Sequence, residues 1–153
     1  MYRCFFYYWN YKIIVMKKLN TVIYGATGSI GLTTISIIKD NIKQINIEGL
    51  TCDKNIKKLC NIADKFNVKK IGFNESALKK KENVSLNKYE VFDDISKFDQ
   101  MISKKTDIIV FATSGIDSLN LFTKILKSGK VIGVANKECI ISIGHKLNKY
   151  ANE

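Results

Sequence analysis

The feature that most constrains this chain is a glycine-rich turn, G-A-T-G-S-I-G, over residues 25–31. An apolar, β-rich run at residues 21–24 precedes the turn, and residues at helical spacing follow it, so the turn is predicted to join a strand to a helix. One face of that helix is expected to carry Ile30, Thr34, Ile37 and Ile38. A phosphate-binding loop requires this setting, although glycines also serve ordinary turns. We therefore predict nucleotide binding here.

Each glycine of the turn has a distinct expected role. Gly25 would allow the tight turn, and Gly28 would let the backbone approach a pyrophosphate. Gly31 would let the helix pack close to the strand. The N-terminus of the helix would supply unbonded N–H groups and partial positive charge to the phosphates.

The rest of the chain alternates between strand and helix patterns. We expect strands at 21–24, 45–52, 70–73, 89–92, 107–112 and 131–134. We expect helices at 29–39, 56–66, 94–103, 118–127 and 138–150. This alternation predicts an α/β fold with a doubly wound, mostly parallel, Rossmann-like sheet. Such sheets bind ligands at the carboxyl ends of their strands, where loops 25–31, 52–55, 112–118 and 135–138 would meet.

The loop after the second expected strand bears on the choice of cofactor. An acidic residue at this place, about 20 residues past the glycines, usually holds the ribose 2′-OH of NAD. Asp53 fits that role, whereas Lys54 could pair a 2′-phosphate and Asn55 could donate a hydrogen bond to it. Alternatively, Asp53 or Asn55 caps the next helix and Lys54 points to water. The spacing alone therefore favours neither NAD nor NADP as the cofactor.

Composition limits the other classes of function. The net charge of +11 fits an anionic partner, but the lysines are dispersed and the chain has one arginine, so a solvated lysine-rich surface is favoured. Four cysteines without C-x-x-C spacing and a single histidine argue against a zinc site. Reduced, buried thiols in a cytosolic protein are the simplest account of Cys4, Cys52, Cys60 and Cys139.

The N-terminal stretch, residues 1–15, holds seven of the sixteen aromatic residues. It is too short to span a bilayer as a helix, which needs about 20 apolar residues, and it lacks a signal-peptide cleavage pattern. A peripheral membrane anchor is one interpretation. We favour another, in which Met16 is the natural start and residues 16–153 form the cofactor domain.

Two motifs together resemble the 1-deoxy-D-xylulose 5-phosphate reductoisomerase family. The glycine turn, with Thr34 and Ile38 after it, resembles the opening of that family. Residues 128–130, the run Val134-Ala135-Asn136-Lys137-Glu138 and Gly144 resemble its second signature, which is the more specific of the two. The resemblance covers nearly the whole chain from Lys17.

The resemblance implies an NADPH-dependent enzyme of the non-mevalonate isoprenoid pathway. The family converts 1-deoxy-D-xylulose 5-phosphate to 2-C-methyl-D-erythritol 4-phosphate, using a divalent Mg or Mn ion as Lewis acid. By this resemblance Thr27, Gly28, Ser29 and Ile30 contact the pyrophosphate and its flanks, and Lys54 and Asn55 hold the 2′-phosphate. Asn136 and Glu138 lie by the nicotinamide, and Lys137 faces the phosphorylated substrate.

The chain also departs from the family pattern. Asp53 adds a negative charge beside the expected 2′-phosphate site, and residues 116–118 lack a common proline. The family's metal-binding carboxylates, its lid and its helical C-terminal domain lie beyond Glu138, and the 15 residues that follow do not resemble them. We therefore expect neither a metal site nor catalytic residues here, but the cofactor domain of a truncated or split enzyme.

Two other classes of function stay open at this point. One is a stand-alone nucleotide-binding module or a remnant that never performed the chemistry. The other is a basic protein of nucleic acids or membrane surfaces, suggested by the charge and the aromatic stretch. We expect neither nucleic acid nor membrane as a partner. We expect a cytoplasmic enzyme and, at full length, a homodimer.

Overall fold

The computed structural model describes residues 17–74, 85–147 and 149. The aromatic stretch at 1–15, the proposed start at Met16 and the lysine triplet at 79–81 lie outside the described residues. Cys4 does so too. Cys52, Cys60 and Cys139 carry buried thiols, as predicted.

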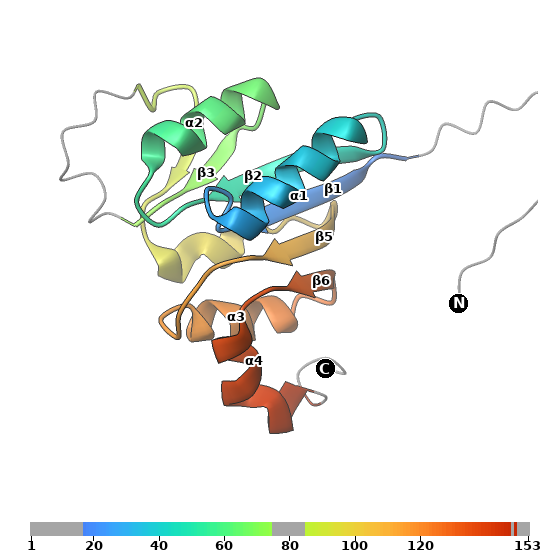
Figure 1. Ribbon diagram of the computed structural model, residues 1–153, viewed down its shortest axis with the longest axis vertical. Coiled ribbons are helices and arrows are strands. Elements are labelled where there is room, and N and C mark those ends of the chain that lie inside the picture. Colours follow the sequence, from blue (N-terminus) through green and yellow to red (C-terminus); the bar gives the residue numbers. More distant parts are fainter. Residues whose placement is uncertain (1–16, 75–84, 148, 150–153) are drawn as a thin grey trace, which may run out of the picture.

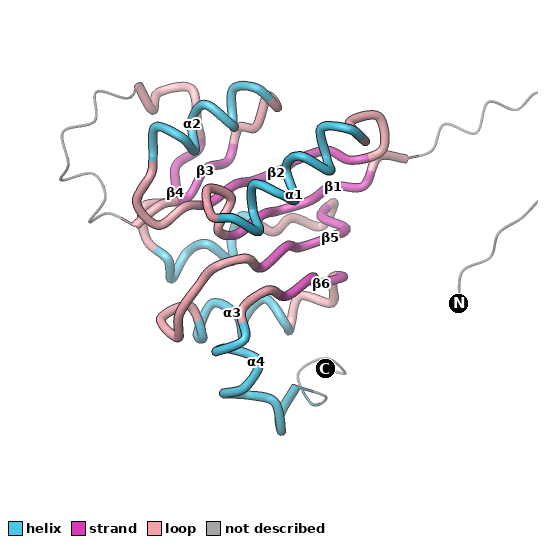
Figure 2. The backbone as a smooth tube through the Cα atoms, viewed as in Figure 1, coloured by secondary structure: helices cyan, strands magenta, loops and turns pink. Residues whose placement is uncertain are grey.

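Six parallel strands form one sheet in the described part of the chain. They are β1 (Leu19–Tyr24), β2 (Ile45–Thr51), β3 (Lys70–Gly72), β4 (Glu90–Phe92), β5 (Thr106–Phe111) and β6 (Val131–Val134). The spatial order is β4-β3-β2-β1-β5-β6, so β1 lies inside the sheet between β2 and β5 (Figure 2). This arrangement confirms the predicted parallel α/β sheet.

Helices cover both faces of the sheet. They are α1 (Ser29–Asp40), α2 (Ile56–Lys65), the 3₁₀ helix η2 (Ile95–Met101), α3 (Leu119–Leu126), α4 (Lys137–Ile143) and the 3₁₀ helix η3 (Gly144–Lys146). In Figure 1, α1 and α2 lie over one face, and η2 and α3 lie behind the sheet on the other. The fold is therefore doubly wound.

The strands divide the core into two clusters because successive side chains of a strand point to opposite faces. On β1, Ile23 packs with Ile35 of α1 and Leu59 of α2. Its neighbours Val22 and Tyr24 pack on the other face, in the cluster of η2 and α3. Both neighbours are completely buried, as expected of a strand covered on both sides.

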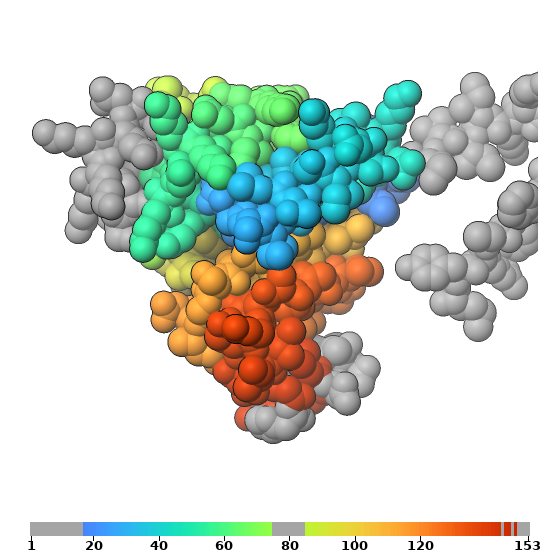
Figure 3. Space-filling model, in the orientation of Figure 1, coloured from blue at the N-terminus to red at the C-terminus, as the bar shows by residue number. Residues whose placement is uncertain are grey.

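The predicted inner face of α1 is correct for Ile38, which is buried, and for half-buried Thr34, but wrong for Ile30 and Ile37. Gly31, Ile35 and Ile38 are buried, whereas Ile30 and Ile37 are 49% and 57% exposed. The reason is the position of Gly31, which packs directly against the backbone of the glycine turn and so fixes the rotation of the helix. Residues four and seven positions later then face the sheet. Figure 3 shows α1, in blue, at the molecular surface.

Two other expected helices differ from the structure. Asp94 does cap the 94–103 segment, accepting the Ser96 N–H at 2.8 Å, but the segment forms a 3₁₀ helix that ends at Met101. The C-terminal α-helix ends at Ile143 instead of 150, and the chain tightens into η3 from Gly144. Glycine is a poor helix former, which accounts for the break. Tyr150 lies outside the described residues.

Candidate functional site

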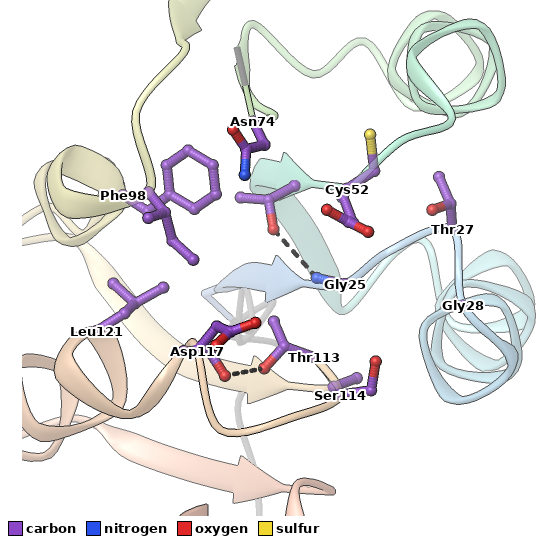
Figure 4. Close-up of a pocket in the computed structure, with 15 residues that line it drawn as sticks. Gly25, Thr27, Gly28, Cys52, Asn74, Phe98, Thr113, Ser114, Asp117 and Leu121 are labelled. Atoms are coloured by element: carbon purple, nitrogen blue, oxygen red, sulfur yellow. Dashed lines mark hydrogen bonds between the residues drawn. The ribbon is translucent and has the colours of Figure 1, made fainter. Parts of the chain in front are cut away.

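A pocket of about 280 Å³ opens at the carboxyl ends of the strands. This is just below the roughly 300–1,000 Å³ typical of small-molecule sites. Three of the four expected loops contribute to it. Its lining residues are Gly25, Thr27, Gly28, Thr51, Cys52, Asp53, Asn74, Ile95, Phe98, Ala112, Thr113, Ser114, Asp117, Ser118 and Leu121. In Figure 4, Phe98 and Leu121 lie toward one end of the pocket, and Thr27 and Gly28 toward the other.

The glycine loop is anchored to the end of β2 by one residue. The N–H of Gly25 donates to Thr51 Oγ1 at 3.1 Å, as Figure 4 shows, and the N–H of Ala26 donates to the Thr51 carbonyl at 2.7 Å. Gly25 has a φ of +83°, which L side chains rarely adopt. A Cβ there would also lie 2.9 Å from the Thr113 nitrogen. The predicted tight-turn role of Gly25 is confirmed.

The other two glycines of the motif differ in what the fold demands of them. A Cβ on Gly31 would lie 2.7 Å from the Ala26 Cα, so close packing of α1 requires this glycine, as predicted. Gly28 has a φ of −77°. A Cβ on Gly28 would meet, among the described residues, only the Gly25 carbonyl, at an ordinary 3.5 Å. The fold therefore does not require glycine at position 28. A side chain at this position would extend into the space in front of the loop.

The N-terminus of α1 has the properties of an anion site. Gly28 is its N-cap, no described side chain caps it, and its first turn contains no acidic residue. Intrahelical bonding begins with the Leu32 N–H, which donates to Gly28 O at 2.9 Å. The preceding N–H groups carry the partial positive charge of the helix. Ser29 and Ile30 are exposed at this end, so a ligand can reach their backbone.

The loop after β2 places its three expected residues differently. The side chains of Asp53 and Lys54 are 71% and 79% exposed and form a 3.6 Å ion pair. Asn55 is the N-cap of α2, because its Oδ1 accepts the Lys58 N–H at 3.0 Å. The alternative in which Asn55 caps this helix is therefore confirmed. Its Nδ2 group still offers donors to a ligand.

Asn136 is hydrogen-bonded to the 113–118 loop. Its side chain is almost fully buried, and its Nδ2 donates to the Gly115 carbonyl at 3.0 Å and lies 3.3 Å from Ser118 Oγ. Its Oδ1 accepts the Cys139 N–H at 2.8 Å and so caps α4. Ser118 Oγ lies 3.0 Å from Thr113 Oγ1, the second dashed line in Figure 4.

The residues around Asn136 divide between interior and surface. Burial raises the pKa of the Cys139 thiol, with an opposing effect from its hydrogen bond with Ser118, so the thiol stays protonated at neutral pH. Lys137 is exposed and Glu138 is half-buried, and neither lines the pocket. Glu138 lies in the first turn of α4, where a negative charge is favourable.

The structure therefore gathers Gly25, Thr27, Gly28 and Asp53 at one pocket, beside exposed Ser29, Ile30 and Lys54. It also adds four residues that no sequence pattern singled out: Asn74, Ile95, Phe98 and Leu121. Asn74 lies in the loop after β3, Ile95 and Phe98 lie in η2, and Leu121 lies in α3, and they share no motif. The one sequence signal that could have found Asn74 and Ile95 is that each follows closely on the end of a strand.

The described residues lack two further kinds of feature. They contain no group of three or more His, Cys, Asp or Glu side chains placed to hold a metal ion. None of the described helices is both long and apolar enough to cross a bilayer.

Comparison with known proteins gives consistent matches. Residues 21–144 match the family model of 1-deoxy-D-xylulose 5-phosphate reductoisomerase. The enzyme of that name from Pelagibacter ubique is 39% identical over 144 residues, which are 88% of this chain and 36% of that protein. That from Thermoanaerobacter sp. is 31% identical, over 84% of this chain and 34% of that protein. The chain thus spans about a third of the length of these relatives.

Solved reductoisomerase structures also resemble this chain. The Zymomonas mobilis reductoisomerase in complex with NADPH superimposes with a TM-score of 0.76 at 24% identity, over 89% of this chain and 36% of that one, which supports the fold. A reductoisomerase in complex with NADPH, fosmidomycin and magnesium gives 0.75 at 26% identity, over 88% and 34%. Because the family model matches residues 21–144 and the Pelagibacter ubique relative is 39% identical over 88% of this chain, the chain belongs to the 1-deoxy-D-xylulose 5-phosphate reductoisomerase family.

Proposed function

We propose that this chain is the NADPH-binding part of an enzyme that converts 1-deoxy-D-xylulose 5-phosphate to 2-C-methyl-D-erythritol 4-phosphate. The observation that carries the proposal is the uncapped N-terminus of α1, which opens beside Gly28, the one glycine of the motif that the fold does not require. A pyrophosphate would explain both features, since it needs helical N–H donors and close backbone approach.

The remaining site residues suit the other parts of the cofactor. The exposed Asp53–Asn55 loop follows β2, where a dinucleotide places its adenosine ribose. At the far end of the pocket, Phe98 and Leu121 offer apolar surface to an uncharged part of the ligand. Bound NADPH would supply the hydride that reduces the rearranged substrate.

Residues 136–138 would lie near the nicotinamide end of the cofactor and the substrate. Asn136 holds the 113–118 loop in shape, so its support for the nicotinamide would act through that loop and the α4 cap. Exposed Lys137 would present a positive charge to the substrate phosphate, and half-buried Glu138 would lie at the nicotinamide. These roles rest on the family motif.

Among the described residues, no group of three or more His, Cys, Asp or Glu side chains is placed to hold a divalent metal ion. We infer that the metal carboxylates lie in the part of the family's length that this chain does not span. We also propose that the full-length enzyme is a cytoplasmic homodimer with neither nucleic acid nor membrane as partner.

Calorimetric titration of the 153-residue chain with NADPH tests the proposal directly. We expect saturable binding with one NADPH per chain, tighter than NADH and unchanged by EDTA. Absence of binding to either dinucleotide would refute it. We further expect no metal-dependent NADPH oxidation when the substrate and Mn²⁺ are added. Such turnover would show that the metal carboxylates have been placed wrongly.

A further inference from the structure

Lys54 lies in the loop between β2 and α2, and Lys58 lies in α2 itself. Of the two, Lys54 is the less favourable phosphate ligand. Its side chain is 79% exposed, and its Nζ lies 3.6 Å from the Asp53 carboxylate. Water and salt screen exposed charges strongly. Asp53 would also repel a phosphate that Lys54 attracts. Lys54 alone therefore gives a weak preference for a phosphorylated ribose.

Lys58, in the first turn of α2, has a different environment. It is half-buried, and its Nζ lies 3.4 Å from the carbonyl oxygen of Thr27 in the glycine loop. The Asn55 cap fixes its backbone by accepting the Lys58 N–H. Among the described residues no carboxylate lies within 4.0 Å of its ammonium group. Its charge is thus held at the loop without an acidic partner.

The contact with Thr27 leaves most of the ammonium group available. A lysine ammonium has three donors, and the Thr27 carbonyl takes one. The contact joins the glycine loop to the helix that begins after the Asp53–Asn55 loop. A dinucleotide-binding fold places the adenosine ribose between the glycine loop and the loop after β2. In this partly buried position a charge pair is less screened than at the surface.

We propose that Lys58 is the residue that determines specificity for the 2′-phosphate of NADPH, with Lys54 in a secondary role. This inference rests on the proposed NADPH binding. Lys58 keeps its bond to the Thr27 carbonyl and donates its other N–H groups to the phosphate. Asp53 acts in the opposite sense, because its carboxylate accepts a hydrogen bond from the free 2′-OH of NADH.

The test compares NADPH and NADH affinities of the full chain and its variants by calorimetry. Lys58→Ala is expected to weaken NADPH binding about tenfold, the effect of one charge-assisted hydrogen bond, while NADH binding stays within about twofold. Lys58→Gln removes the charge but keeps a donor for the Thr27 carbonyl, so it should also lose the preference for NADPH over NADH. Lys58→Arg should retain it. Lys65→Ala, on the exposed last turn of α2, is the matched control and should change neither affinity.

Other outcomes separate the two proposals. If Lys58→Gln weakens NADPH and NADH equally, Lys58 only shapes the loop and the inference is overturned. If Lys58→Ala and Lys58→Gln both keep the preference for NADPH over NADH, Lys54 is sufficient and the inference is again overturned, while NADPH binding by the chain stands. If the unmodified chain binds neither dinucleotide, the proposed function fails. Should Lys58→Ala not fold, Lys58→Gln alone decides the matter.

Discussion

Two loops at the same edge of the sheet are held in shape by different means. The glycine loop, 25–28, depends on backbone conformation, with a positive φ at Gly25 and close packing of Gly31 behind it. The 113–118 loop depends on buried polar side chains, with Asn136 and Ser118 bonded to its atoms. Asn136 lies 21 positions from the Gly115 carbonyl to which it donates.

This difference explains why one loop was recognised from the sequence more fully than the other. A backbone-determined loop needs glycine at fixed spacings, and such spacings are visible in a sequence. A loop held by side chains needs partners that the fold brings from elsewhere. The same difference determines whether a substitution in each loop should mainly affect folding or mainly affect binding.

Gly31→Ala should have the largest effect on folding. The added Cβ would lie 2.7 Å from the Ala26 Cα and 2.8 Å from its carbonyl carbon, and backbone cannot move aside cheaply. We expect the free energy of unfolding to fall by about 3 kcal/mol. Urea unfolding followed by circular dichroism measures this. Stability equal to that of the unmodified chain would show that α1 does not pack against the turn as described.

Gly28→Val should separate binding from folding within the same loop. Its extended backbone and open surroundings accept a side chain, so stability should change by about 1 kcal/mol or less. NADPH affinity should fall by about a hundredfold, equivalent to about 2.7 kcal/mol, because the side chain keeps the pyrophosphate from the backbone. Calorimetry and thermal unfolding on one preparation measure both. Native affinity would mean that the loop is an ordinary turn.

Asn136→Ala tests the side-chain-held loop, and Asn55→Ala is its matched control. Both asparagines accept an N–H three residues later, at 2.8 and 3.0 Å, but only Asn136 is buried and bonded to the pocket loop. We expect losses of about 2 kcal/mol for Asn136 and about 1 kcal/mol for Asn55. Denaturant unfolding compares them. Equal losses would mean that the contacts to the 113–118 loop contribute nothing to stability.

Lys54→Ala should have the smallest effect. Its exposed pair with Asp53 is screened, so the NADPH preference should narrow only about threefold, against about tenfold at Lys58. Parallel titrations with NADPH and NADH give the ratio, with the exposed Lys39→Ala as control. If Lys54→Ala narrowed the preference for NADPH tenfold, Lys54 would contribute as much to that preference as is expected of Lys58, and its secondary role would be contradicted.

The elements that the sequence predicted well share a local cause. The strands ending at Tyr24 and Thr51 were found within two residues of each end, because β-rich runs with strong turns after them leave few alternatives. The rotation of α1 was missed because its isoleucines occupy several faces, and only contact with the turn chooses among them. Phe98 and Leu121 reach the pocket from elements with no motif of their own.

The sequence by itself determined the alternation of elements, the glycine turn and the family, since each depends on residues adjacent in the chain. The tertiary structure alone decided that Gly28 is unconstrained by its neighbours, that Asn136 holds the 113–118 loop, and that Lys58 reaches Thr27 across 31 positions. The physical reason is distance along the chain. Local spacing sets backbone conformation, whereas burial and long-range hydrogen bonds exist only after strands and helices have packed.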